Sequence, residues 1–305
     1  MATAPSDYAL QEDFVASEQY EVGESVSLWQ DTWRRMRRNR LALIATAFVL
    51  FVLLVAIVSQ FWTPYPIWRQ GVGPTYQTPT LKHPLGLDQS GRDILSRLMG
   101  GAAISMEVGI GTALLSSVIG IVLGLLAGFY RGWIDSVISL VINVWYGIPD
   151  LLVVIMIVVI TGRRELLFII IAISITAWVN MARLVRGQTL SLREREFVEA
   201  ARSIGTRDFS ILFRHIFPNA LGPIIVQATY LVPSAIIFEA FLSYLGLGVP
   251  PPNPSWGAMT AEGYRSLQYA PHITLIPALA LGLTLVALNA FGDGLRDALD
   301  PRMRR

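Results

Sequence analysis

Few residues in this sequence have the types and spacing that chemistry requires. The chain has no cysteine, which excludes a thiolate nucleophile, a disulfide and a cysteine-based metal site. Its histidines, His83, His215 and His272, are scattered without the HExxH spacing of a zinc site. Lys82 is the only lysine and no GxxxxGK[ST] segment occurs, so a phosphate-binding loop is excluded. We therefore expect no catalytic residue, no metal site and no cofactor bound by this chain.

Two carboxylates stand inside long apolar segments. A carboxylate at bilayer depth costs several kcal/mol unless it is satisfied, so Asp150 and Glu239 indicate a transport pathway, a gate or a polar partner. Asp150 has an alternative role, because after Pro149 it would begin a resumed half-helix whose amides and dipole favour a carboxylate. Glu239 has one too, as a structural pair with a neighbouring helix or subunit. Asn143 is a third candidate for the pathway or gate.

The elements that position these residues are predicted to be membrane helices. The chain has 305 residues, of which 53% are hydrophobic and only 15% charged, which is too apolar for an ordinary soluble domain. We predict an all-α polytopic membrane protein. Its six expected transmembrane helices cover 41–62, 102–130, 135–160, 166–185, 220–247 and 273–291. Gly120, Gly124 and Gly128 in the second predict close packing against another helix.

Charged segments divide the chain and orient it. We predict a disordered tail at 1–27, an amphipathic elbow on an anionic lipid surface at 28–40, the first transmembrane helix with an extracytoplasmic loop at 41–101, a five-helix core at 102–292 and a tail at 293–305. With both termini in the cytoplasm, 17 of the 24 lysines and arginines lie inside, as the positive-inside rule requires. The net charge of +2 gives no reason to expect a nucleic-acid partner.

A charged island at 193–219 separates two apolar regions. It is predicted to form two short helices around Gly205, with Thr206 capping the second and Pro218 ending it. One face of each helix is marked by apolar residues: Phe197, Ala201 and Ile204 in the first, and Phe209, Leu212, Phe213 and Ile216 in the second. By periodicity alone, this hairpin could equally be a helix lying in the membrane interface.

The order of residues in the hairpin resembles a known motif. Glu199, Ala200, Ala201, Gly205, Ile216 and Pro218 are similar to the EAA motif of ABC importer permeases. In that family the hairpin is the coupling helix, which docks into a groove on a separate ATPase subunit. Two small alanines permit close approach of another surface, and the carboxylate beside them offers a charge-assisted anchor.

Three further segments resemble the C-type permeases of dipeptide, oligopeptide and nickel ABC importers. They are HPLGLDQSGRDILSRLMGG at 83–101, EAFLSYLGLGVPPPNPSWG at 239–257 and GDGLRDALDP at 292–301. Leu87, Gly100 and Tyr244 replace the threonine, tyrosine and phenylalanine usual in these signatures. Asp88 and Asp93, within the first segment, are expected to cap and charge a helix start.

This resemblance implies an ABC importer type I permease that moves peptides across the cytoplasmic membrane of a bacterium or archaeon. The implied partners are a homologous B-type permease, two ATP-binding cassette subunits or a fused pair that bind ATP and Mg, an extracytoplasmic solute-binding protein and membrane lipid. Nickel, glutathione and opine are alternative substrates in the same family. A different class, an ion-coupled secondary transporter with Asp150 and Glu239 as cation sites, and a nontransporting scaffold are the competing hypotheses.

Overall fold

The computed structural model describes residues 28–299 as a set of helices, and the predicted tails at 1–27 and 300–305 lie outside this range. The elements are α2 (Leu28–Met36), α3 (Arg40–Phe61), α4 (Ile94–Tyr130), α5 (Gly132–Tyr146), α6 (Asp150–Thr161), α7 (Leu166–Arg193), α8 (Glu196–Ser203), α9 (Asp208–Ile211), the π-helix η1 (Leu212–Ile216), α10 (Phe217–Tyr244), α11 (Trp256–Tyr264) and α12 (His272–Leu299).

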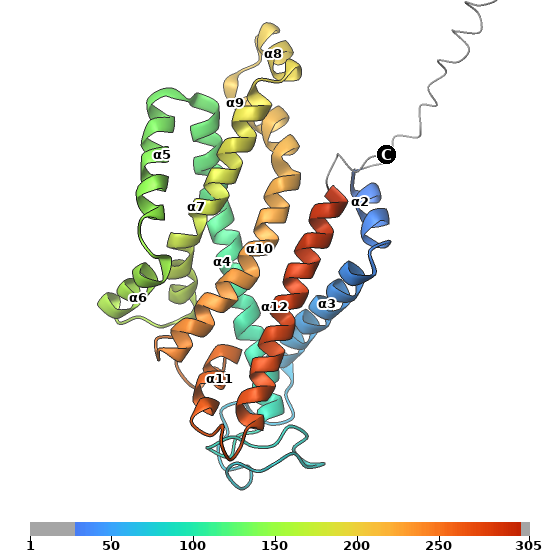
Figure 1. Cartoon of the computed structure of the whole chain (residues 1–305), viewed down its shortest axis with the longest axis vertical. Helices are drawn as coiled ribbons and strands as arrows, with labels where there is room; N and C mark the ends of the chain where they lie inside the picture. Colours follow the sequence, from blue (N-terminus) through green and yellow to red (C-terminus); the bar gives the residue numbers. More distant parts are fainter. Residues whose placement is uncertain (1–27, 300–305) are drawn as a thin grey trace, which may run out of the picture.

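The predicted membrane architecture is confirmed. Five helices are long and apolar enough to cross a membrane, and α5 with α6 forms a sixth crossing if that bent pair is one span. The two halves of the pair meet at 87°. Figure 1 shows α6 lying across the direction of α5. The break falls at Pro149, where the sequence predicts an interruption, because proline removes a backbone donor and clashes with the preceding turn.

Helices α4 and α7 form a tightly packed central pair. A Cβ atom added at Gly120 would lie 2.6 Å from the Met181 Cβ, and one at Gly124 would lie 2.6 Å from the Ala182 carbonyl oxygen. Gly128 meets Thr189 of α7 in the same way. The prediction that these glycines allow close helix packing is therefore confirmed, since any larger side chain would push the two backbones apart.

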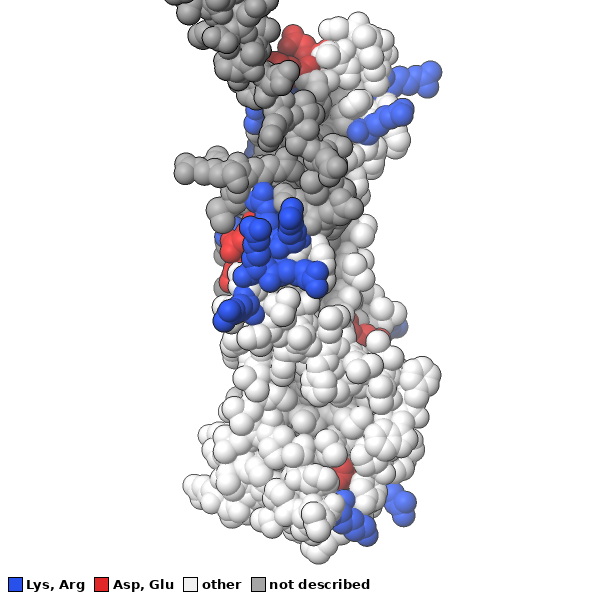
Figure 2. Space-filling view, turned by 90° about the vertical axis from the view of Figure 1, so that its right-hand side faces the viewer, with Lys and Arg blue, Asp and Glu red and all other residues white. Residues whose placement is uncertain are grey.

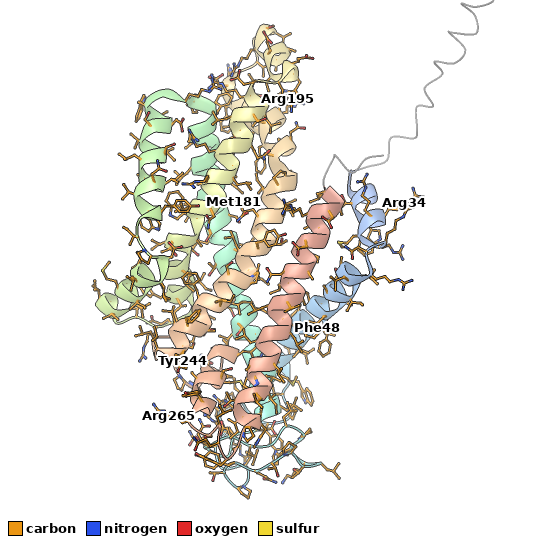
Figure 3. All side chains as sticks on the ribbon, in the orientation of Figure 1. Arg34, Phe48, Met181, Arg195, Tyr244 and Arg265 are labelled. Carbon is orange, nitrogen blue, oxygen red and sulfur yellow. The ribbon has the colours of Figure 1, made fainter. Side chains whose placement is uncertain are left out.

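The hairpin and the long loop lie at opposite ends of the molecule. In Figure 1, α8 stands at one end, whereas the loop at 62–93 and α11 lie at the other. Figure 3 marks the two ends by Arg195, which precedes α8, and Arg265, which follows α11. This arrangement agrees with one cytoplasmic and one extracytoplasmic end, separated by the apolar helices.

The elbow carries exposed basic and aromatic side chains. Trp33 is 53% exposed, and the Arg37 guanidinium lies 5.7 Å from the centre of its ring. Figure 2 shows basic side chains gathered near this part of the molecule above a surface almost without charge. A cationic helix at the edge of an apolar surface suits the headgroup level of an anionic leaflet.

Several predicted boundaries differ in the structure, among them the end of the helix predicted at 166–185, which runs to Arg193. The helix predicted from 102 begins at Ile94, because the Asp93 side chain accepts a hydrogen bond of 2.8 Å from the Ser96 amide and caps the helix start. The segment predicted as a tail from 293 is helical through Leu299. It stays helical because Leu295 packs with Met36 of α2 and anchors the polar turns of α12 to the elbow.

The long loop is fastened by buried charges, and this corrects one expectation. Asp88 does not cap a helix; its carboxylate accepts a 2.6 Å bond from Arg92 Nε and pairs with Arg97. Both arginines also pair with Glu262 of α11, at 2.8 and 3.0 Å. Asp88 and Glu262 each accept from both guanidinium groups, so the ion network joins the loop to α11. Among these side chains, Arg97 Nε is the one buried nitrogen that has no hydrogen-bond partner within residues 28–299.

Candidate functional site

The turn of the hairpin depends on Gly205. This residue has φ of +77°, and its amide donates a 2.9 Å bond to the Arg202 carbonyl at the end of α8. An added Cβ would meet nothing within 4 Å, so space is not what requires glycine here. The requirement is the left-handed backbone, as predicted from the sequence.

The hairpin buries a different apolar stripe from the one that periodicity suggested. The buried residues are Val198, Ala201, Ile211, Leu212 and Ile216, which pack with Phe129 and Leu125 of α4. Phe197, Ile204 and Phe209 are 40%, 83% and 69% exposed. The predicted face of Phe197, Ala201 and Ile204 is divided, because Ala201 is buried while Phe197 and Ile204 are exposed. Val198 is buried with Ala201 in the apolar cluster that includes residues of α4, α7 and the second arm.

The second arm of the hairpin is also longer than predicted. The helical path from Asp208 to Tyr244 runs for 37 residues, through α9, η1 and α10. Pro218 therefore does not end a helix; it lies in the first turn of α10, next to a π-helical turn in which the bonding register changes. Arg207, and not Thr206, occupies the N-cap. The second arm is thus an extension of a candidate membrane span.

The residues of the motif fall into an exposed group and a buried group. Glu199, Ala200 and Gly205 are exposed, and Pro218 is exposed on the second arm. Ala201 and Ile216 are buried within the chain. Within residues 28–299, Glu199 makes no side-chain hydrogen bond or ion pair. The carboxylate, the first alanine and the apolar side chains of Phe197, Ile204 and Phe209 together form an open surface at the end of the molecule, named here the hairpin face.

Arginines fasten the base of the hairpin to α4. The Arg193 guanidinium donates to the Phe129 carbonyl and lies 5.8 Å from the centre of the Phe129 ring, and Arg202 approaches the same ring at 5.9 Å. Arg131 pairs with Glu194. Cation–π contacts and charge-assisted hydrogen bonds hold the orientation of α8 relative to the membrane helices.

A polar cavity lies within the membrane part of the fold. Its volume is about 170 Å³. The lining residues from α6, α7 and α10 are Asp150, Ile173, Thr176, Ala177, Asn180, Gln227, Tyr230, Leu231, Ser234, Ala235 and Phe238. Polar groups at bilayer depth lie where they face water or protein and not lipid tails, so this cavity is the candidate for the transport pathway.

Asp150 lines this cavity from the first turn of α6. Its predicted place after Pro149 is confirmed. Within residues 28–299, however, its carboxylate accepts no hydrogen bond from the first-turn amides and joins no ion pair. The helix dipole still favours its charge, but its oxygen atoms remain open to the cavity. Its role in the pathway stays a prediction.

Glu239 and Asn143 lie away from this cavity. Glu239 is buried, and its Oε1 accepts bonds from the hydroxyls of Ser243 at 2.6 Å and Ser255 at 2.7 Å. Ser255 is the N-cap of α11, so Glu239 connects the end of α10 to α11. Asn143 is exposed on α5. The three candidates for a pathway or gate are therefore not brought together in one site.

Sequence reasoning missed charged groups in the other apolar helices. Glu107 of α4 is exposed at the level of the spans, and Arg186 of α7 forms a two-bond pair with Asp135 of α5 at 2.5 and 2.8 Å. The rule that identified Asp150, a charge inside an apolar helix, applies equally to Glu107, which lies within the helix predicted at 102–130. It would have found Arg186 if the helix predicted at 166–185 had been longer.

Comparison with known proteins matches this architecture to transporters. Residues 120–305 match the family described as binding-protein-dependent transport system inner membrane component, and residues 27–79 match the N-terminal TM domain of oligopeptide transport permease C. In the MetNI methionine ABC transporter, solved in inward-facing conformations, one chain has a TM-score of 0.55 at 21% identity, covering 67% of this chain and 96% of that chain. This likeness concerns the fold alone.

Relatives of higher identity span nearly the whole chain. The dipeptide transport system permease protein DppC of Bacillus subtilis is 42% identical over 282 residues, which are 92% of this chain and 88% of that protein. The oligopeptide transport system permease protein OppC of the same organism is 41% identical, with 92% of each chain covered. The glutathione transport system permease protein GsiD of Pectobacterium atrosepticum is 41% identical, covering 90% of this chain and 92% of that protein. The chain therefore belongs to the binding-protein-dependent inner membrane components and is an OppC-type, multi-pass permease of the dipeptide, oligopeptide and glutathione ABC transporters.

Proposed function

We propose that this permease moves peptides into the cytoplasm and that its hairpin face receives an ATPase subunit. Hydrolysis of ATP takes place in other subunits, as in every importer built from a separate permease and ATPase. The observation that carries the proposal is the continuous helical path from Asp208 to Tyr244. One end of this path lies in the hairpin, and Gln227, Tyr230 and Ser234 on the same path line the polar cavity.

This continuity gives a physical route for coupling. A helix transmits displacement along its axis because its backbone hydrogen bonds resist bending, although Pro223 and Pro233 each remove one such bond within α10. When an ATPase moves the hairpin face, α10 moves with it, and the wall of the cavity changes its position relative to α6 and α7. Glu199 and Ala200 supply the polar anchor and the close approach on that face, and Gly205 holds its shape.

The proposed assembly has several other members. A binding-protein-dependent component works with an ATPase and a solute-binding protein. We assign ATP and Mg to two ATPase subunits or a fused pair, and the second half of the pore to a homologous B-type permease. The hairpin and both termini would face the cytoplasm, and the solute-binding protein would meet the end that carries α11. The exposed arginines of the elbow would contact anionic lipid.

Peptide is preferred over glutathione as the substrate because the family matched at residues 27–79 is that of oligopeptide transport permease C, and two of the three relatives described above are peptide permeases. The test is uptake by proteoliposomes that hold the complete importer and its binding protein. Radiolabelled tripeptide should enter in the presence of ATP, and glutathione should enter at least about tenfold more slowly, a difference of 1.4 kcal/mol. Faster uptake of glutathione would assign the chain to the other substrate, and uptake without ATP would contradict the coupling proposal.

A further inference from the structure

The cavity between α6, α7 and α10 has a charge that nothing on its own walls balances. Asp150 is the one charged residue among those that line it, and the polar remainder consists of Thr176, Asn180, Gln227, Tyr230 and Ser234. In the described part of the chain, Asp150 has no hydrogen-bond partner and no ion pair. Its two oxygens therefore keep all their acceptor positions free for a molecule that enters the cavity.

The nearest arginine along α7, Arg183, contacts an aromatic ring of α5. Arg183 stands one turn from Asn180, and its guanidinium lies 3.9 Å from the centre of the Tyr146 ring. The Tyr146 hydroxyl in turn donates to the side-chain amide oxygen of Asn180. This arrangement holds the arginine against α5 and leaves the cavity with a net negative charge beside neutral amides and hydroxyls.

The chemistry of this lining suits a primary ammonium group. Such a group carries a positive charge and three N–H donors, which one carboxylate and the oxygen atoms of Asn180, Gln227 and Ser234 can accept together. A bound divalent transition metal would instead require several imidazole or carboxylate ligands. Among residues 28–299 no group of three or more such side chains is close enough to hold one.

We infer that Asp150, with Asn180 and Gln227, binds the ammonium group of the transported solute, which in a peptide is its amino terminus. This inference rests on the proposed function, since it concerns the substrate of the same permease. Asp150 is fixed at the start of α6, after the 87° break, whereas Ser234 and Gln227 belong to α10, which is joined to the hairpin. Movement of α10 would separate the neutral acceptors from the carboxylate, so that the site holds the ammonium group in one state and releases it in another.

The absence of cysteine from the sequence gives a direct test. Ser234→Cys places one thiol in the cavity of the complete importer, held in nanodiscs without its binding protein. The thiol is labelled with cationic trimethylammonium-ethyl methanethiosulfonate or with anionic sulfonatoethyl methanethiosulfonate, and mass spectrometry of this chain follows the rates. When each rate is divided by the rate of the same reagent with free cysteine, the cationic reagent should react about tenfold faster than the anionic one, which corresponds to 1.4 kcal/mol.

Two variants identify the source of this preference. Asp150→Asn should abolish it, whereas Glu107→Gln, which removes an exposed carboxylate outside the cavity, should leave it unchanged. Equal rates for the two reagents, or a preference that survives Asp150→Asn, would overturn the inference.

A second measurement addresses the ligand itself and needs no change at Asp150. Trialanine at millimolar concentration should slow labelling of the Ser234→Cys thiol, and N-acetyl-trialanine, which lacks the ammonium group, should not. Equal protection by the two peptides would overturn the ammonium site even if Asp150→Asn failed to assemble. Uptake in proteoliposomes is measured separately, so loss of the labelling pattern with intact peptide uptake contradicts this inference alone, and intact labelling without peptide uptake contradicts the proposed function alone.

Discussion

Arg186 of α7 and Asp135 of α5 form a two-bond ion pair, with distances of 2.5 Å from Nε and 2.8 Å from Nη2 to the carboxylate oxygens. Ser139 donates a further bond of 3.0 Å to the same carboxylate. The pair links the first half of the broken span to the central α4 and α7 pair. It is partly shielded, with the two side chains 32% and 19% exposed.

Removal of one partner of this pair should destabilise the protein. Arg186→Gln leaves a partly shielded carboxylate with only Ser139 beside it, and we expect a loss of about 1–2 kcal/mol, less than for a fully buried pair. Thermal unfolding in nanodiscs measures the effect. The double variant Asp135→Asn with Arg186→Gln should recover part of the loss. If the losses of Arg186→Gln and Asp135→Asn measured separately add up in the double variant, the pair is not coupled.

Substitutions at Gly205 and Glu199 should impair the coupling of ATP hydrolysis to uptake without affecting insertion of the protein into the membrane. Gly205→Val forces a β-branched residue to φ near +77°, at a cost of about 1–3 kcal/mol, and distorts the hairpin face. Glu199→Lys reverses the charge of the proposed anchor. Both variants should reach the membrane, and ATP-dependent uptake should fall while ATP hydrolysis continues.

The control for these variants is Ser203→Ala, which removes a hydroxyl bonded to the carbonyl of Glu199 within α8 and leaves the hairpin face unchanged. Its uptake should remain normal. Normal uptake in both Gly205→Val and Glu199→Lys would refute the assignment of the coupling hairpin.

The two apolar stripes of α8 should respond differently to truncation. Ile204 is 83% exposed, so Ile204→Ala should leave thermal stability unchanged and weaken capture of the ATPase, by about 1–2 kcal/mol if it is a central contact. Val198 is fully buried, so Val198→Ala should lower stability by about 1–2 kcal/mol. Co-purification of the ATPase and thermal unfolding separate the two effects. Undiminished capture with Ile204→Ala would place the docking surface elsewhere.

The seam between α4 and α7 should not tolerate a methyl group. Gly124→Ala places a Cβ 2.6 Å from the Ala182 carbonyl oxygen, and we expect destabilisation of about 1–3 kcal/mol. Gly187→Ala is the matched control, because nothing lies within 4 Å of its added Cβ. A helical alanine there should be neutral or stabilising by up to about 1 kcal/mol. Chemical denaturation in detergent compares the two variants, and similar losses would argue against the seam.

Local signals in the sequence predicted much of the fold. Apolar length identified the spans, Pro149 marked the break, and Gly205 and Asp93 marked helix ends, because each of these effects depends on a few adjacent residues. The buried face of α8 could not be predicted, because its short sequence carries two apolar stripes. Only packing into the cluster that includes residues of α4 buries Val198 and leaves Ile204 exposed. The angle of the break also depends on packing and not on proline itself.

Long-range pairs account for the rest of what sequence reasoning missed. Asp88 reads as a cap, but it is held by Arg92 and Arg97, which also contact Glu262 far along the chain. Asp150 was identified as an intramembrane carboxylate, whereas its neighbours Asn180 and Ser234 come from two other helices and have no motif of their own. One sequence does not record which helices become neighbours.

The glycine seam also limits how this permease can change shape. Gly120, Gly124 and Gly128 receive atoms of α7 at three successive levels, so sliding α4 past α7 by a helical turn would drive side chains of one helix into the backbone of the other. The two helices must therefore move together as one rigid unit. In the proposed coupling, the change between inward and outward access would come from movement of α10 relative to this pair and from bending at the break before Asp150.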